Sequence, residues 1–136
     1  VGNKNLFMHN EKKTRYILLL TRDHKRVDLH RFSASIGIPK GLRFAHEDEL
    51  VAMLGVNRGA VTVLGVINDL HHRVELFIDR ELWQAGSIHA HPLANTSTLV
   101  LSPQALEKFF ALTGHQPVFV DVPGSEMNGK PAVGRE

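Results

Sequence analysis

The sequence contains no cysteine among its 136 residues. Disulfide bonds, thiolate nucleophiles and the usual Cys-containing zinc sites are therefore excluded. It also lacks an apolar run as long as the ~20 residues that a membrane-spanning helix requires. The longest apolar stretches, 16–20 and 61–67, have the length of strands. Because no signal-peptide pattern is visible either, we expect a cytoplasmic protein that does not bind membranes.

An excess of charge of one sign is also missing. Lys and Arg number 16 against 14 Asp and Glu, a net charge of +2. This excess is too small for a protein that coats nucleic acid, so we expect no DNA binding, whereas brief contact with one RNA end is compatible with it. Nine histidines are present. Five of them stand among polar residues and are expected at the surface: His9, His24, His30, His46 and His115.

Three segments have the pattern of short helices. Asp28 precedes an apolar face of 3,4 spacing over 29–36, which ends before a glycine. A second helix over 47–54 starts with three acidic residues, which suit the positive end of the helix dipole, and stops at Gly55. The third begins with the N-cap and first-turn proline of Ser102-Pro103 and continues to Gly114.

The remaining apolar segments predict strands. Segments 6–8 and 15–21 are joined like a hairpin, and 59–67 is expected to be a buried strand bent at its glycines. Further strands are expected at 42–44, 73–79, 87–91, 98–101 and 117–122. Strands outnumber helices and the connections look too short for repeated crossover helices. The class is therefore α+β, one domain with a mixed, mostly antiparallel sheet or a partly closed barrel flanked by short helices.

Three motifs occur in a family-specific order: Lys4-Asn5-Leu6-Phe7-Met8, then the segment 59–69 from Gly59 to Asp69, then His91-Pro92-Leu93-Ala94-Asn95-Thr96. Together they resemble the YbaK/ProX prolyl-tRNA editing family, nearest to the freestanding branch that clears alanyl-tRNA(Pro). Members of that family usually have residues before the first motif. We therefore expect residues 1–122 to be an editing domain that lacks its amino-terminal segment, followed by a loose C-terminal tail over 123–136.

The resemblance implies an activity and its partners. It implies a trans-editing deacylase that hydrolyses mischarged tRNA(Pro), with alanyl-tRNA(Pro) as the expected substrate and no cofactor. By the resemblance, such an enzyme positions a water molecule against an activated ester, and the terminal ribose hydroxyl of the tRNA assists the hydrolysis. The sequence contains no Gly-x-Ser-x-Gly segment, so it gives no support for an acyl-enzyme intermediate. The implied partners are the acceptor end of aminoacyl-tRNA and prolyl-tRNA synthetase.

Two residues are the catalytic candidates. The Lys4 ammonium can meet a terminal phosphate or the substrate as a compact charge with three donors. His91 precedes Pro92, which biases it toward extended geometry, so its ring is held where it can orient water or bind the substrate. Asn5 both donates and accepts hydrogen bonds and is expected to hold the aminoacyl group or the ribose.

Other residues are expected to complete the pocket. Backbone N–H groups from Gly86 to Ala90 are candidate donors to the ester carbonyl. The remaining substrate-binding candidates are Thr62, Gly65, Asn68, Pro92 and Asn95. A small pocket shaped by apolar residues would admit alanine and reject proline by size. The side chains expected to shape it are Val63, Leu64 and Val66, of which at least half are expected to be core.

Two other functions remain open from the residues. The first is a non-catalytic module that binds tRNA or a synthetase. The second is a metal-dependent hydrolase of small molecules, because His89 and His91 would project from the same face of a strand as half of a metal site. Asp79 or His71-His72 could add ligands, but no known spacing links them, and we predict no metal. Alanine, serine, threonine and cysteine all remain possible amino acids for removal.

Overall fold

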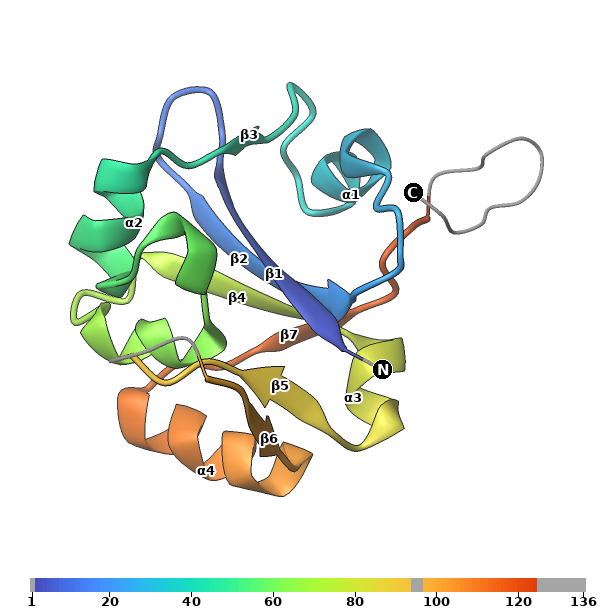
Figure 1. Cartoon of the computed structure of the whole chain (residues 1–136). Helices are drawn as coiled ribbons and strands as arrows, with labels where there is room; N and C mark the ends of the chain where they lie inside the picture. Colours follow the sequence, from blue (N-terminus) through green and yellow to red (C-terminus); the bar gives the residue numbers. More distant parts are fainter. Residues whose placement is uncertain (1, 94–96, 125–136) are drawn as a thin grey trace.

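An open five-stranded sheet forms the centre of the computed structural model, which describes residues 2–93 and 97–124 (Figure 1). Its strand order is β3-β1-β2-β4-β7. The strands are β1 (Asn3–His9), β2 (Tyr16–Arg22), β3 (Arg43–Phe44), β4 (Val74–Asp79) and β7 (Val118–Val120). β1 is antiparallel to both β2 and β3, whereas β4 is parallel to both β2 and β7. The α+β class and the mixed sheet are confirmed, and the barrel alternative is wrong because the sheet does not close.

Two long crossovers make the parallel pairs possible. The first, between β2 and β4, holds α1 (Leu29–Ser35), β3, α2 (Glu47–Leu54) and the 3₁₀ helices η1 (Arg58–Ala60) and η2 (Val63–Asn68). The second, between β4 and β7, holds α3 (Arg80–Ala85), β5 (Ile88–Ala90), β6 (Leu99–Leu101) and α4 (Pro103–Thr113). β5 and β6 form a separate antiparallel pair. The expectation that these connections are too short for crossover helices was therefore wrong.

The core lies on both faces of β2. Leu18 and Leu20 belong to a cluster with residues of α2, η2, β4 and α4, whereas Ile17 and Leu19 pack with Phe32 of α1 on the other face. All five side chains are 0% exposed. A strand that is covered on both faces needs apolar residues at every position, and this explains why 16–20 contains no polar alternation.

The predicted caps of three helices are confirmed. The Asp28 carboxylate accepts from the Arg31 N–H, and the Ser102 hydroxyl accepts from the Ala105 N–H. Gly55 and Gly114 end α2 and α4 with φ of 69° and 82°, in the left-handed region that glycine adopts at little cost. Local sequence signals therefore set these helix boundaries.

The segment 59–67 is not a strand, and that prediction was wrong. Thr62 caps η2, and Val63 and Val66 are buried together at the three-residue spacing of a 3₁₀ turn. A side chain at Gly65 would place its Cβ 2.9 Å from the carbonyl oxygen of Leu54, so only glycine allows this close approach to α2. Packing against α2 overrides the strand preference of the valines.

One helix was missed from the sequence, and the expected exposure of two histidines was wrong. Helix α3 was not predicted, although Asp79 caps it by accepting from the Glu81 N–H. His9 and His115, expected at the surface, are 4% and 6% exposed. The His115 Nε2 lies 2.9 Å from the Asp69 carboxylate, an acidic partner 46 positions away that the local sequence does not reveal.

The first residues of the expected tail are attached to the domain. The Pro123 carbonyl accepts from the Asp28 N–H at 2.8 Å, and Gly124 forms a bridge with Val27. Positions 125–136 lie outside the described residues, so the loose tail stays a prediction. In the described part of the chain, no helix has the length and apolar character to cross a bilayer.

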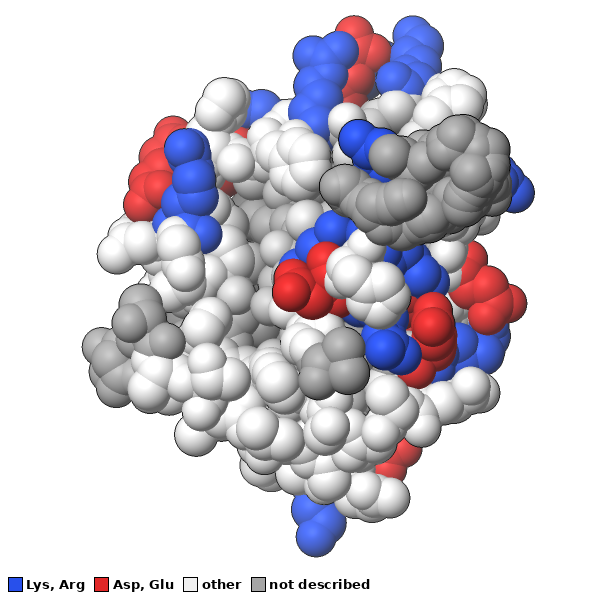
Figure 2. All heavy atoms as spheres, turned by 45° about the vertical axis from the view of Figure 1, so that its right-hand side comes forward, with Lys and Arg blue, Asp and Glu red and all other residues white. Residues whose placement is uncertain are grey.

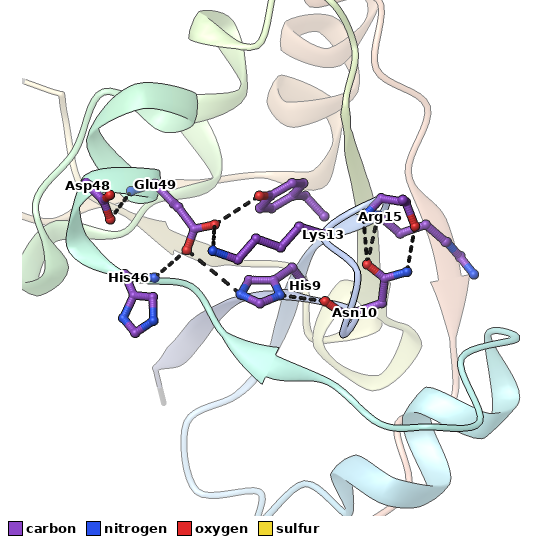
Figure 3. Close-up of polar contacts among 9 residues, drawn as sticks. His9, Asn10, Lys13, Arg15, His46, Asp48 and Glu49 are labelled. Atoms are coloured by element: carbon purple, nitrogen blue, oxygen red, sulfur yellow. Dashed lines mark hydrogen bonds and ion pairs between the residues drawn. The ribbon is translucent and has the colours of Figure 1, made fainter.

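A carboxylate joins the β1–β2 hairpin to α2 (Figure 3). Glu49 accepts from the His46 N–H at 2.8 Å and from the Tyr16 hydroxyl at 2.9 Å, and the Lys13 ammonium lies 3.3 Å away. Burial opposes ionisation of Glu49, but these three donors outweigh it and lower its pKa from 4.5 to about 2. The His9 ring lies 3.8 Å from the same carboxylate.

This contact predicts a specific acid sensitivity. Because the folded pKa of Glu49 is about 2 against 4.5, its carboxylate stabilises the fold fully above pH 4.5, and this contribution disappears as the pH falls toward 2. Glu49→Gln should lower the free energy of unfolding by about 2 kcal/mol at pH 7, with a difference that shrinks toward pH 2. Urea titrations from pH 2 to 7 measure it. Glu107→Gln on exposed α4 is the control, and a pH-independent difference for Glu49→Gln would contradict the mechanism.

Candidate functional site

The edge of β1 is partly uncovered. β3 pairs with β1 only at Met8 and His9, and the last backbone contact on this side runs from the Ala45 N–H to the Phe7 carbonyl. In an antiparallel strand the backbone groups of alternate residues point to the same side. The N–H and C=O of Asn5 therefore point in the same direction as those of Phe7, toward the open edge.

A cavity of about 250 Å³ lies along this edge. Its lining comes from β1, from β3 and the residue after it, from α2 and from the segment around η1. The lining residues are Asn5, Leu6, Phe7, Phe44, Ala45, Leu50, Arg58 and Val61. The side chains around this space are mainly apolar, and Asn5 and Arg58 are its polar members. A small, mainly apolar space with few polar groups has the character of a ligand site.

Asn5, which lines the cavity, has a buried side-chain acceptor without a partner among the described residues. Its Nδ2 donates to the Val61 carbonyl at 3.2 Å and so ties β1 to the segment between η1 and η2. Its Oδ1 is buried and is the one buried side-chain polar atom without a partner among the described residues. Leaving such an acceptor unpaired costs about 1–3 kcal/mol. A ligand N–H or O–H at this position would remove that cost.

Two further contacts bring the three motifs together. The Thr62 hydroxyl oxygen accepts from the His91 N–H at 3.2 Å and from the Leu64 N–H at 3.3 Å. The Asn3 side chain accepts from the His89 N–H at 2.7 Å and donates to the His89 carbonyl at 3.0 Å. The start of β1, the segment before η2 and the end of β5 are therefore fixed to one another, as the course of β5 beside the amino-terminal end of β1 in Figure 1 illustrates.

Lys4 lies on the opposite face of β1 from Asn5. Strand alternation places its side chain with Leu6 and Met8, on the face that packs against α1. No ion pair or hydrogen bond of its ammonium occurs within the described residues. Lys4 is therefore a cation at the open edge that can meet a ligand phosphate.

His91 has a defined setting. Its Nδ1 lies 3.1 Å from the Ser97 carbonyl, and this carbonyl fixes that nitrogen as the donor. Its Nε2 then carries the lone pair. The two N–H groups of His89 and His91 are already bonded to Asn3 and Thr62. The His89 N–H is thus not a free donor to an ester carbonyl, whereas the donor role expected of the other amides from Gly86 to Ala90 stays a prediction.

Several predicted site residues have evident packing roles. The Asn68 amide donates to the Leu54 carbonyl at 2.9 Å, and Gly65 packs on the same turn of α2. Gly86 ends α3 with φ of 87°, and Ala90 is 2% exposed in the core. Binding roles for these residues stay predictions. The same holds for Pro92, and Asn95 lies outside the described residues.

The apolar residues expected to shape the pocket lie elsewhere. Val63 and Val66 are fully buried in the core, and Leu64 packs against it. The cavity is lined in part by motif residues (Asn5, Leu6, Phe7 and Val61) and in part by residues to which the sequence analysis gave no binding role (Phe44, Ala45, Leu50 and Arg58). For Phe44 the sequence offered an aromatic residue in the strand expected at 42–44, and the exposure that distinguishes it is seen in the structure.

No three His, Asp or Glu side chains converge as a metal site in the part of the chain that the structure describes. His89 and His91 therefore have no third ligand there. On the face in Figure 2, basic and acidic side chains lie together at the upper left, the top and the right, and the lower part carries few charged side chains. Without a patch of one sign on this face, contact with a charged ligand depends on a few placed groups.

Comparisons with known proteins agree with this arrangement. The sequence profile of the aminoacyl-tRNA editing domain matches residues 2–109, which include the open edge, η2 and β5. The chain belongs to this family. The editing domain is 36% identical to prolyl-tRNA editing protein ProX of Acetoanaerobium sticklandii over 112 residues, 82% of the chain and 68% of that protein. The YbaK/ProX resemblance is therefore confirmed.

A second relative extends the comparison to vertebrates. The editing domain is 37% identical to prolyl-tRNA synthetase associated domain-containing protein 1 of Danio rerio. The match covers 88% of the chain but 65% of that relative, so the chain spans slightly less than two thirds of its length.

Two solved structures share the fold. Hypothetical protein APE2540 superposes with a TM-score of 0.67 at 21% identity over 89% of this chain and 73% of its own. A protein solved as a candidate trans-editing enzyme for prolyl tRNA synthetase superposes with a TM-score of 0.64 at 24% identity. This match covers 90% of this chain and 70% of that protein's chain. At these identities the likeness establishes the architecture.

The Thr62 hydroxyl should be essential for the junction between the segment before η2 and the end of β5. Thr62→Val keeps the shape but leaves the His91 and Leu64 N–H groups without their acceptor. We expect a loss of about 2 kcal/mol in the free energy of unfolding, measured by urea denaturation, and Thr62→Ser should restore most of it. Equal stability of Thr62→Val and the unmodified protein would show that the hydroxyl does not hold the junction.

Proposed function

We propose that this editing domain is a trans-editing deacylase that hydrolyses mischarged tRNA(Pro), with alanyl-tRNA(Pro) as its substrate. Family membership and the names of its relatives support the tRNA(Pro) part of the proposal. The unsatisfied Asn5 Oδ1 beside the cavity is the observation that carries it. In this proposal the domain works in the cytoplasm on the acceptor end of aminoacyl-tRNA, with prolyl-tRNA synthetase as a second partner.

Asn5 suits the α-ammonium group of an aminoacyl ester. An ammonium has three N–H donors, and one of them would satisfy the buried Oδ1. The outward N–H of Asn5 on the open edge is a donor for the ester carbonyl, where negative charge develops during attack by water. Asn5 alone would then orient the amino acid, because it binds both the α-ammonium group and the ester carbonyl.

Lys4 and His91 have separate roles. The ammonium of Lys4, unpaired within the described residues, would bind the terminal phosphate and so fix the tRNA end at the strand edge. The His91 Nε2, which carries the lone pair, would accept a proton from water or from the ribose hydroxyl. Water adds to the ester carbonyl, the bond to the ribose oxygen breaks, and that oxygen leaves as a hydroxyl with the amino acid released.

Size explains how alanine would be removed while proline is spared. The apolar wall of the cavity includes Leu6, Phe7 and Leu50, which are anchored in the strand and helix. A rigid apolar wall rejects a bulky ring by overlap more strongly than it rejects a small side chain. Proline also has a secondary amine, which presents one donor fewer to Asn5.

Deacylation assays test the proposal. The purified protein should release alanine from alanyl-tRNA(Pro) and leave prolyl-tRNA(Pro) intact. Lys4→Ala and Asn5→Ala should each lower kcat/KM by about 100-fold, because each removes one positioned polar group. Lys12→Ala, in the exposed hairpin loop, is the matched control and should not change it. Unchanged rates in folded Lys4→Ala would remove Lys4 from the mechanism.

A chelator distinguishes the metal-dependent alternative. Hydrolysis in this proposal needs no metal, so overnight dialysis against EDTA should leave the rate within twofold of the untreated sample. Loss of activity that zinc or manganese restores would instead support a metal held by His89 and His91. Binding of alanyl-tRNA(Pro) without turnover of any alanyl, seryl, threonyl or cysteinyl ester would support the non-catalytic binding module.

A further inference from the structure

Phe44 is an aromatic side chain left exposed at the mouth of the cavity. Its side chain is 54% exposed, in a strand of two residues. Phe44 lies opposite Met8 in the β1–β3 pair, so it stands on the same face of the sheet as Leu6 and Lys4. The fold does not use this ring as core, although it lines the cavity beside Asn5.

Arg58 lines the same cavity from another element. It is the first residue of η1, and its side chain is 72% exposed. Its backbone N–H donates to Glu47 at 3.2 Å, whereas its Nε lies 3.9 Å from that carboxylate. The backbone of Arg58 is therefore fixed to α2, and its guanidinium is held only weakly and can adopt a position over a ligand.

A flat apolar ring and a planar cation at one cavity are suited to another aromatic ring. Bases stack on aromatic side chains for about 1–3 kcal/mol each, and a guanidinium adds a cation–π contact. The aminoacyl ester is attached to the ribose of the last nucleotide, so the base of that nucleotide must lie within one sugar of the group held by Asn5.

We propose that Phe44 and Arg58 bind the 3′-terminal adenine of the tRNA while Asn5 holds the aminoacyl group. This inference rests on the proposed function, and it assigns the base to a different part of the cavity from the amino acid. Because these contacts are made equally before and during hydrolysis, they should affect KM and not kcat. A raised KM with an unchanged kcat would indicate base binding, whereas a lowered kcat would indicate a role in the chemistry.

Steady-state deacylation of alanyl-tRNA(Pro) tests the KM effect. Phe44→Ala should raise KM about tenfold with kcat within twofold, and Phe44→Tyr should restore KM because it keeps the ring. Arg58→Ala should raise KM less. Leu112→Ala is the matched control, because Leu112 is 87% exposed on α4 and should leave both constants unchanged. Normal KM in Phe44→Ala would overturn the proposal.

A binding assay that needs no turnover keeps this inference separate from the proposed function. Phe44→Trp places an indole at the cavity, and adenosine 5′-monophosphate should quench its fluorescence. The unmodified protein, which has Trp83 alone, should show no such change. Quenching in Phe44→Trp from a protein without deacylase activity would refute the proposed function and support the base site. Active protein with no quenching and an unchanged KM in Phe44→Ala would refute the base site alone.

Discussion

Strand β2 has no side that faces solvent, and the positions of the other elements follow from this constraint. Leu18 and Leu20 are covered by α2, η2 and α4, while Ile17 and Leu19 are covered by α1. Covering both faces requires helices in both crossovers, and those helices make the parallel pairs with β4 and β7 possible. β1 and β4 occupy the two neighbouring positions, so β1 is placed near the edge of the sheet.

The candidate site is a consequence of incomplete coverage of β1. β3 is too short to pair with the first half of that strand, and η1 approaches the gap without closing it. Side chains rather than strand pairing then connect the neighbouring segments, through Asn5 to Val61 and through Asn3 to His89. The part of β1 that β3 does not reach directs the outward backbone groups of Asn5 toward a small substrate, and little reorganisation of a paired strand is needed when the substrate binds.

Buried polar contacts stabilise the elements around the site without taking part in it. Asp79 accepts from the Thr21 hydroxyl and from Lys25, and burial opposes but does not outweigh the effect of this carboxylate, which raises the pKa of Lys25. Burial likewise opposes ionisation of Asp69, but hydrogen bonds from His115 and from two backbone amides lower its pKa. Each contact joins segments distant in sequence, and together they fix the ends of β4 on which α3 and β7 depend.

The sequence by itself determined the caps of α1, α2 and α4 and the β1–β2 hairpin, because Asp28, Ser102, Gly55 and the hairpin loop act through local chemistry. It also determined the α+β class, and the order of the three motifs identified the family. Tertiary structure decided the rest. Gly65 packs on Leu54, so a valine-rich segment became 3₁₀ helix; His115 is buried because Asp69 lies 46 positions away. Phe44 and Arg58 line one cavity only because β3 and η1 flank the same edge, and no local pattern encodes which segments of the chain flank the same strand.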